Sequence, residues 1–360
     1  MARELAARLI AMSRTRWIAA ASIAAGVALL GVLVVFTPWK LLVERVATVP
    51  WQGWVGATLG MSATYALRAG RLRAEWLWKL RTLNLGYREC LQVTLLHNAA
   101  INILPMRSGE ASYSFLLHRR WGVGLGDATA SLLWLRLQDM MVLGVLGIAI
   151  LVPAPLAWRI GFAVATIVAA ATLLPRLVLR IHVHARWARA RVHADASARR
   201  TRKAWHLVAK VAGAFRAARG GAAAWGFAIA NWVLKLGIVG VLLASLADLP
   251  LGAGFCGALG GELAGVIPLQ APAGVGTYEA GVALGTQAHR ADSLAQGATA
   301  TAAQGANATA APATPANTDN RRLIFGAALA VHALMLVVAL ATALAFSLIV
   351  RPLRAPESKP

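Results

Sequence analysis

The chain has 360 residues, of which 58% are hydrophobic and 14% are charged, and its mean hydropathy is +0.61. This composition excludes an ordinary soluble domain and indicates a membrane protein. The formal net charge is +22, but the basic residues lie between apolar runs, so we interpret them as topology signals facing an anionic leaflet rather than as a nucleic-acid surface.

Several apolar runs are long enough to predict complete membrane spans. The first run has no small-residue cleavage site after it, so we expect it to remain as a span and not to be removed as a signal peptide. The predicted spans are residues 17–36, 51–67, 126–150, 156–174, 224–246 and 321–350. The predicted fold class is therefore an all-α polytopic membrane protein, with residues 1–360 forming a single transmembrane domain.

Two further apolar segments are interrupted before they could cross a membrane. Residues 91–121 break at a Pro-Met-Arg-Ser-Gly-Glu turn, and residues 252–285 break at a stretch rich in Pro and Gly. Each arm is shorter than the ~20 residues that a spanning helix needs. Irregular, charged backbone is stable at membrane depth only where protein or a water-filled cavity shelters it. Both segments are therefore predicted to be re-entrant helical hairpins.

The distribution of Lys and Arg predicts the orientation. Residues 1–16, 68–88, 176–219 and 351–359 are basic, so we expect them and both termini to face the cytoplasm of a bacterial inner membrane. This arrangement makes the first hairpin enter from the cytoplasm and the second from outside. Two broken segments of opposite entry are typical of transporters built from inverted repeats, and topology alone supports that symmetry here.

Two long polar segments connect the spans. Residues 176–221 are predicted to form a basic cytoplasmic loop that contains an amphipathic helix lying on the anionic leaflet. The alternatives are a solvated helix packed on the membrane domain and, as a distant third, a nucleic-acid surface. Residues 286–320 are rich in Ala, Thr, Gln and Asn and are predicted to be a low-complexity periplasmic linker.

Ionisable residues in apolar surroundings are candidate functional groups, because each needs an opposite charge or water. Arg136 and Asp139 are three residues apart on one helical face and can pair, either along a pathway or as a structural lock. Lys235 and Glu262 could pair or reach the membrane interface. The full set is Arg107, Glu110, Arg136, Asp139, Lys235, Glu262 and Glu279.

The hairpin turns hold the strongest of these candidates. Arg107, Glu110 and Glu279 lie at breaks where a spanning helix has no reason to stop. A helix beginning at Ser108 would offer free N–H groups to an anion. Asn102 is expected to support hairpin packing through hydrogen bonds, with substrate contact as the alternative.

No pattern in the chain indicates enzymatic chemistry. A phosphate-binding P-loop, a Ser/His/Asp arrangement and a metal-ligand spacing are absent from the sequence. The longest polar loop is also shorter than the ~50 residues at which soluble domains begin. We therefore predict a protein that is not an enzyme and that uses no cofactor or metal.

Three separated motifs resemble the lysylphosphatidylglycerol synthase transmembrane family, the flippase half of a group of bifunctional proteins. The motifs are N-x-L-P-x-R-x-G-E at residues 102–110, R-x-x-D at 136–139, and P-x-x-x-P-x-G-x-G-x-x-E at 268–279. The resemblance implies a multi-pass inner-membrane module with re-entrant helices that moves aminoacylated phosphatidylglycerol between leaflets. The soluble synthase domain of the bifunctional members is absent from this sequence, so lipid synthesis is not implied.

The resemblance also implies roles for individual residues. Arg107 and Arg136 would hold a lipid phosphate, Glu110 and Glu279 would meet a cationic group or a coupling proton, and Asp139 would orient Arg136. The predicted substrate-binding residues are Asn102, Arg107, Glu110, Arg136, Asp139, Lys235, Glu262, Gly274, Gly276 and Glu279.

The leading prediction is a lipid translocase that passes a polar head group between the hairpins while the acyl tails stay in the bilayer. The alternatives are an ion-coupled transporter of a small soluble solute and a membrane scaffold for a lipid-modifying enzyme. The expected partners are membrane lipids, the anionic inner leaflet, a lipid-synthesising enzyme and a second copy of the chain, and no nucleic acid is expected.

Overall fold

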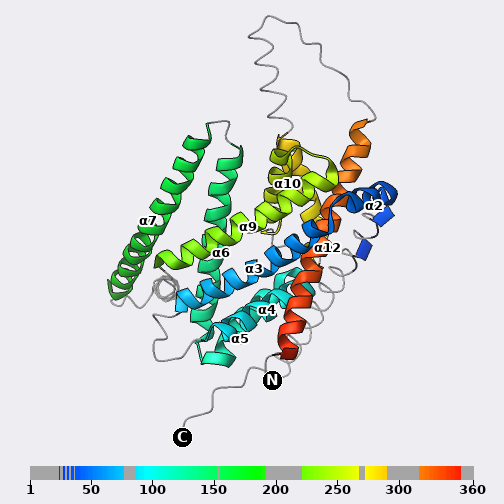
Figure 1. Ribbon diagram of the computed structural model, residues 1–360. Coiled ribbons are helices and arrows are strands. Elements are labelled where there is room, and N and C mark those ends of the chain that lie inside the picture. Colours follow the sequence, from blue (N-terminus) through cyan, green and yellow to red (C-terminus); the bar gives the residue numbers. More distant parts are fainter. Residues whose placement is uncertain are drawn as a thin grey trace, which may run out of the picture. The chain divides into compact units, whose positions relative to one another are not determined.

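The computed structural model describes residues 37–76, 86–151, 155–191, 221–266, 272–289 and 316–349, with single positions between 24 and 35. All regular secondary structure in these ranges is helical, which confirms the all-α class (Figure 1). Most of the predicted span 17–36, residues 192–220 of the basic segment with its predicted interfacial helix, and residues 290–315 of the linker lie outside the described residues.

Three helices are long and apolar enough to cross a membrane. They are α6 (Leu125–Leu151), α9 (Gly221–Ala247) and α12 (Ala316–Ile349), whose candidate spans are Leu125–Ile150, Gly221–Ala247 and Asn320–Ile349. Each contains 26 to 30 residues, or roughly 40 Å at ~1.5 Å per residue. They coincide with three predicted spans, at residues 126–150, 224–246 and 321–350. The chain is therefore a multi-pass helical membrane protein.

Two other helices run past the predicted ends of their spans. Helix α3 (Trp51–Trp76) continues beyond Leu67, and α7 (Leu156–Arg191) continues beyond Leu174. Residues 68–76 and 176–191, which we predicted to be loop, are therefore helical. Both stretches are rich in Arg, Ala and Leu, which favour helix, and lack an effective helix breaker. Within α7, the apolar part is the shorter stretch Ala157–Ala170.

Both hairpin segments are interrupted where Pro and Gly occur. In the first, α4 (Tyr87–Ile103) is followed by the 3-10 turn η1 (Pro105–Glu110) and by α5 (Ala111–Trp121). In the second, α10 (Leu251–Ala264) precedes the turn η4 (Pro272–Gly274) and a helix over residues 277–289. The regular helix of the first segment resumes at Ala111 and not at Ser108 as predicted, because the 3-10 turn occupies residues 105–110.

The chain divides into two compact units, each assembled from separate stretches. Unit 1 contains Met1–Ser62, Asn98–Glu110 and Leu234–Thr342, and unit 2 contains Ala63–His97, Ala111–Val233 and Ala343–Pro360. Helices α3, α4, α9 and α12 each contribute residues to both units. The short helix α2 (Trp39–Thr48) belongs to unit 1.

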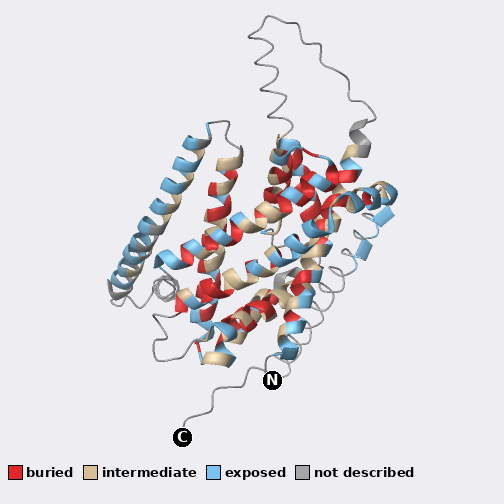
Figure 2. Ribbon diagram, in the orientation of Figure 1, coloured by how far each residue is buried: buried red, intermediate tan, exposed pale blue. Residues whose placement is uncertain are grey.

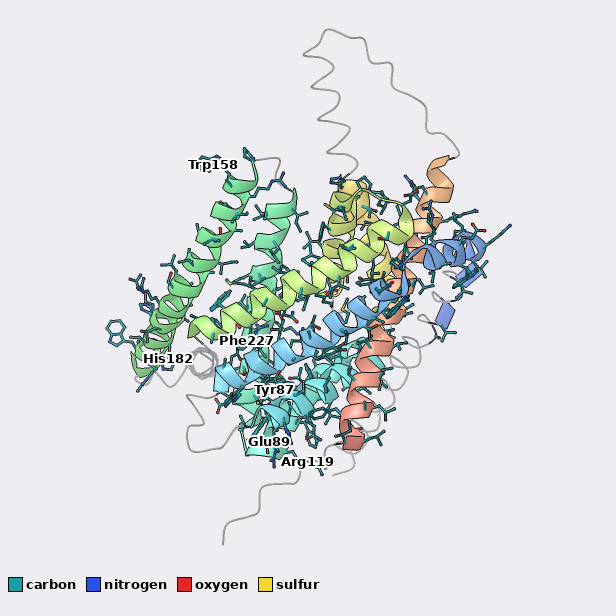
Figure 3. The ribbon with its side chains drawn as sticks, viewed as in Figure 1. Tyr87, Glu89, Arg119, Trp158, His182 and Phe227 are labelled. Atoms are coloured by element: carbon teal, nitrogen blue, oxygen red, sulfur yellow. The ribbon has the colours of Figure 1, made fainter. Side chains whose placement is uncertain are left out.

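In unit 2, α6 packs against both α5 and α7. Gly70 of α3 permits a close approach to α9, because a Cβ atom there would lie 2.7 Å from the ring of Phe227 (Figure 3). An apolar core lies between helices α3, α4, α5 and α6, whose buried positions are red in Figure 2. Its buried members are Ala69, Leu72, Trp76, Cys90, Val93, Tyr113, Leu117, Val123, Ala128 and Leu132.

In unit 1, α10 packs backbone to backbone against the helix 277–289. A Cβ atom at Gly260 would lie 2.2 Å from the carbonyl oxygen of Gly281, and one at Gly285 would lie 2.1 Å from that of Cys256. Small residues permit such close approach of membrane helices. The turns η1 and η4 also approach each other, with Cα atoms within 8 Å. The turns at which the two segments are interrupted are thus neighbours in this unit.

Candidate functional site

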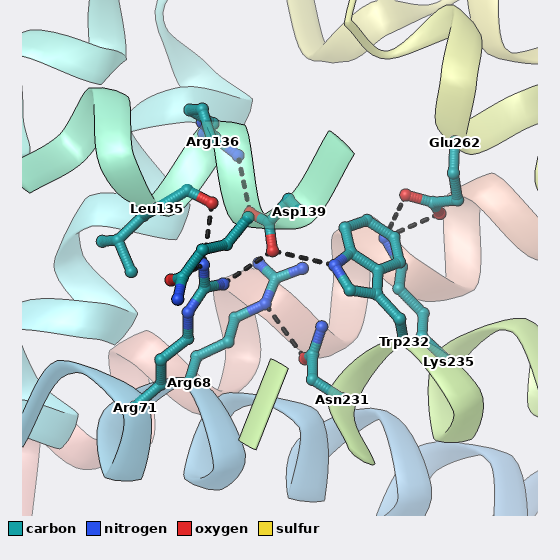
Figure 4. A network of polar contacts seen from close by, with 10 residues as sticks. Arg68, Arg71, Leu135, Arg136, Asp139, Asn231, Trp232, Lys235 and Glu262 are labelled. Atoms are coloured by element: carbon teal, nitrogen blue, oxygen red, sulfur yellow. Dashed lines mark hydrogen bonds and ion pairs between the residues drawn. The ribbon is translucent and has the colours of Figure 1, made fainter. Parts of the chain in front are cut away.

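A buried ion pair joins α3 to α6 in unit 2 (Figure 4). Nη1 of Arg71 donates to Oδ1 of Asp139 at 2.6 Å, and the two side chains are 6% and 12% exposed. Nη2 of the same guanidinium donates to the carbonyl oxygen of Leu135 at 2.7 Å and to Oε1 of Gln138 at 2.8 Å. Arg71 is thereby fixed against one turn of α6.

Asp139 has two further partners. Nε1 of Trp232 on α9 donates to its Oδ1 at 2.8 Å, and Nη1 of Arg136 lies 4.0 Å from its Oδ2. The predicted pairing of Arg136 with Asp139 is confirmed, but Arg71 is the closer cation. Arg136 is also more accessible, with 35% of its side chain exposed.

Arg68 adds a third guanidinium group, one turn before Arg71 on α3. Its Nε donates to Oδ1 of Asn231 on α9 at 3.2 Å. We call Arg68, Arg71, Arg136, Asp139, Asn231 and Trp232 the arginine cluster. It contains three guanidinium groups and one carboxylate, so it carries an excess of positive charge.

A second buried carboxyl lies on α3 beside this cluster. Glu75 is four residues after Arg71 and is fully buried, and Oγ of Ser131 donates to its Oε2 at 3.4 Å. The Ser131 hydroxyl also lies 3.1 Å from the Tyr113 hydroxyl. The Tyr113 hydroxyl in turn accepts a hydrogen bond from Nε1 of Trp76 at 3.4 Å. Oε1 of Glu75 has no hydrogen-bond partner among the described atoms.

Unit 1 holds its own buried ion pair. Nζ of Lys235 on α9 lies 2.7 Å from each carboxylate oxygen of Glu262 on α10. The side chains are largely buried. These residues therefore pair, which is one of the two outcomes that the sequence left open.

The second hairpin turn surrounds a buried carboxyl. Glu279 is fully buried, its Oε2 accepts the Gly276 N–H at 2.6 Å, and Nδ1 of His332 on α12 lies 2.8 Å from its Oε1. Gly274 and Gly276 have φ angles of +80° and +82°, and Ala273 has +60°. The two glycines are suited to this left-handed backbone, whereas Ala273 is strained in it.

The remaining predicted residues lie on the first hairpin. Asn102 is half-buried in the last turn of α4, and Glu110 is half-buried at the end of η1. Arg107 lies within η1, and its side chain is outside the described set. Since η1 packs against η4, the structure brings the turn that contains Arg107 and Glu110 close to the turn that contains Gly274.

Sequence reasoning missed several members of these groups. Arg68 and Arg71 were counted as cytoplasmic loop charges, because their stretch is basic and α3 was predicted to end at Leu67. His332 was overlooked, although a single ionisable residue in an apolar span is itself a signal of function. No group of three or more His, Cys, Asp or Glu side chains suited to a metal occurs in the part of the chain that the structure describes.

Comparison with known proteins identifies the family. A family model described as the lysylphosphatidylglycerol synthase TM region matches residues 20–308. This range includes all three sequence motifs, the arginine cluster and Glu279. No curated protein and no solved structure matches the chain. The chain therefore belongs to the lysylphosphatidylglycerol synthase TM region family, whose name links it to lipid handling.

Proposed function

We propose that the chain is a flippase-like translocase that moves a lipid whose head group contains an anionic phosphate between leaflets. The arginine cluster carries this proposal, because its carboxylate, Asp139, lies near the middle of the candidate span of α6. Asp139 is 14 residues after Leu125 and 11 before Ile150 (139 − 125 and 150 − 139). At ~1.5 Å per residue, these separations are roughly 20 Å and 17 Å. Charged groups at that depth of a ~30 Å hydrocarbon core are costly and mark pathways for polar groups.

Arginine is suited to a phosphate, because its planar fork can donate two parallel hydrogen bonds. Arg71 is committed to three acceptors on α6 and serves as a fixed support. Arg136 lies 4.0 Å from Asp139 and is 35% exposed, so its guanidinium is accessible to a phosphate while it stays beside the carboxylate. In this proposal Arg136 binds the head group, and Asp139 holds it ready between binding events.

The interrupted segments supply the proposed route. Helices α4 and α10 have 17 and 14 residues, fewer than the ~20 typical of a spanning helix, and the turns η1 and η4 are neighbours. We infer that both segments are re-entrant hairpins entering from opposite faces, beside six full spans related by an inverted repeat. Their tips would expose irregular backbone and ionisable groups to a polar route through the membrane.

Individual residues at these tips take the following proposed roles. Arg107 contacts the phosphate when the lipid reaches the turn η1, and Glu110 and Glu279 meet a cationic group of the lipid or a coupling proton. Lys235 and Glu262 form a charge pair that a zwitterionic head group can replace. Asn102, Gly274 and Gly276 line the turns.

The proposed setting is the bacterial inner membrane, with both termini in the cytoplasm. The basic residues 176–221 would face the anionic inner leaflet, and the low-complexity residues 286–320 would lie in the periplasm. The chain would perform no catalysis itself. Its proposed partners are a lipid-synthesising enzyme that supplies the substrate and a second copy of the chain.

Lipid movement in reconstituted vesicles tests the proposal. A fluorescent phospholipid is followed by quenching of the outer leaflet in vesicles that hold the parent, Arg136→Ala, Arg136→Lys or Arg119→Ala. Arg119 is exposed near the end of α5 and serves as the matched control (Figure 3).

We expect Arg136→Ala to slow lipid movement at least about tenfold, because a charged hydrogen bond to phosphate is lost. Arg136→Lys should give a rate of lipid movement between those of the parent and Arg136→Ala, since it keeps the charge but not the planar guanidinium. Arg119→Ala should give the same rate as the parent. Equal rates for the parent and Arg136→Ala would contradict the proposal. Uptake of a soluble solute without lipid movement would instead favour the ion-coupled solute transporter.

A further inference from the structure

The Glu279–His332 pair has a geometry that constrains its protons. Nδ1 of His332 lies 2.8 Å from Oε1 of Glu279, and its Nε2 lies 3.0 Å from the carbonyl oxygen of Ala273. The other carboxyl oxygen, Oε2, accepts the Gly276 N–H at 2.6 Å. Both side chains are buried, with Glu279 at 0% exposure. The imidazole thus connects α12 to two points on the second hairpin.

Counting hydrogens shows how many protons this arrangement needs. A carbonyl oxygen can only accept, so Nε2 of His332 must carry a hydrogen. The contact at Nδ1 then needs a second hydrogen, either on the ring or on the Glu279 carboxyl. A neutral imidazole beside an ionised carboxylate supplies only one of these hydrogens. The observed contacts therefore require one additional proton shared by the pair.

Without that proton, the pair would have a net charge of −1 at a fully buried position, and one contact would join two acceptors. Burying an uncompensated charge is strongly unfavourable, so the arrangement must change. The contact with Ala273 is the one expected to break, because that residue has a φ of +60° and two left-handed glycines follow it closely. Residues 272–276 are then free to move away from α12.

We propose that Glu279 and His332 form a binding site for one proton, which holds the turn of residues 272–276 against α12, and that loss of this proton releases the turn. Because η4 contacts η1, release also changes the junction of the two hairpin tips. The assignment of this proton as the coupling ion rests on the proposed translocase function. The proton-dependent contact itself does not.

Several titratable groups face the pair from neighbouring elements. The ring of Tyr278 lies 4.6 Å from that of His332. Glu262 of α10 interacts electrostatically with Tyr278 and is paired with Lys235 of α9. Glu110 belongs to η1, which packs against η4. Of these, Tyr278 contacts the imidazole directly, so it needs its own control.

Two substitutions separate proton binding from simple packing. In Glu279→Gln, the amide oxygen accepts the Gly276 N–H and the amide NH2 donates to Nδ1 of His332, so every contact is satisfied without a titrating proton. This variant mimics the protonated pair at all pH values. Tyr278→Phe keeps the ring beside the imidazole and removes only the hydroxyl.

Hydrogen–deuterium exchange of residues 274–280 measures the state of the turn. Protection factors are compared at a series of pH values from about pH 5 to about pH 9. Dividing by the intrinsic exchange rate at each pH removes the chemical pH dependence. We expect protection in the parent and in Tyr278→Phe to fall at least about tenfold as pH rises, because a charge-assisted hydrogen bond is lost. Glu279→Gln should stay protected and vary less than about threefold.

A flat profile in the parent, a parent-like profile in Glu279→Gln, or loss of the pH dependence in Tyr278→Phe would overturn the proposal. The exchange experiment involves no transported lipid, so it is independent of the vesicle assay. Proton-dependent exchange without lipid movement would reject the translocase function alone, whereas lipid movement with a flat exchange profile would reject this proton site alone.

Discussion

Replacing Asp139 should destabilise unit 2 far more than the loss of an ordinary hydrogen bond. Both members of the Arg71–Asp139 pair are nearly enclosed, at 6% and 12% exposure. Removing one partner of a buried pair costs about 3–5 kcal/mol, because the other charge remains buried. Hydrogen bonds between membrane helices average about 0.6 kcal/mol. We therefore expect Asp139→Leu to lower the free energy of unfolding by about 3 kcal/mol or more.

A double-mutant cycle isolates this interaction. The parent, Arg71→Met, Asp139→Leu and the double variant are unfolded by denaturant titration in micelles, with Arg45 and Asp248 as the control pair. That control pair has a 2.8 Å contact, but its side chains are 32% and 70% exposed, so a coupling below about 1 kcal/mol is expected.

The buried pair should show a coupling of about 2–3 kcal/mol, and the double variant should be more stable than Asp139→Leu alone. Effects of Arg71→Met and Asp139→Leu that add to within about 0.5 kcal/mol would refute the reasoning, because additivity means that the two charges do not interact.

Two further predictions concern unit 1. A Cβ atom at Gly281 would lie 2.4 Å from a backbone carbonyl oxygen of α10, so Gly281→Ala should lower the free energy of unfolding by about 1–3 kcal/mol. The control is Gly226→Ala on α9, where a Cβ atom would enter open space. In the same unfolding assay, this control should be neutral or stabilising by up to about 1 kcal/mol. Lys235→Met leaves Glu262 as a buried lone charge and should lower the free energy of unfolding by about 3 kcal/mol. Adding Glu262→Leu should recover most of that loss. A double variant no more stable than Lys235→Met would show that the pair is not coupled.

The fold class and the places where the chain breaks could be predicted from hydropathy, length and the positions of Pro and Gly. These signals are local, because the hydrophobic length of a segment and the satisfaction of its backbone hydrogen bonds depend on residues that are close in sequence. The predicted end of α3 at Leu67 was wrong. The apolar run stops there, but the helix continues through Arg-rich residues with high helix propensity. Hydropathy marks where a chain leaves lipid, whereas helix propensity and packing decide where the helix itself ends.

The site was predictable only where its residues are close in sequence. The spacing of Arg136 and Asp139 indicated their contact, and the motif ending at Glu279 indicated the second turn. The pairing of Asp139 with Arg71 joins residues 68 positions apart, and no periodicity carries that information. His332 is 53 residues from Glu279, but as the one ionisable residue between positions 323 and 350 it could have been chosen as a candidate.

We propose above all that the arginine cluster, whose Asp139 lies near the middle of the α6 span, binds a lipid phosphate. Native mass spectrometry of lipids that remain bound after purification tests this most directly, comparing the parent with Arg136→Ala and with the exposed control Arg119→Ala. We predict that the parent and the control retain lipids with anionic phosphate head groups and that Arg136→Ala loses them. Identical lipid profiles in all three proteins, or no enrichment of phosphate-containing lipids in the parent, would contradict the account.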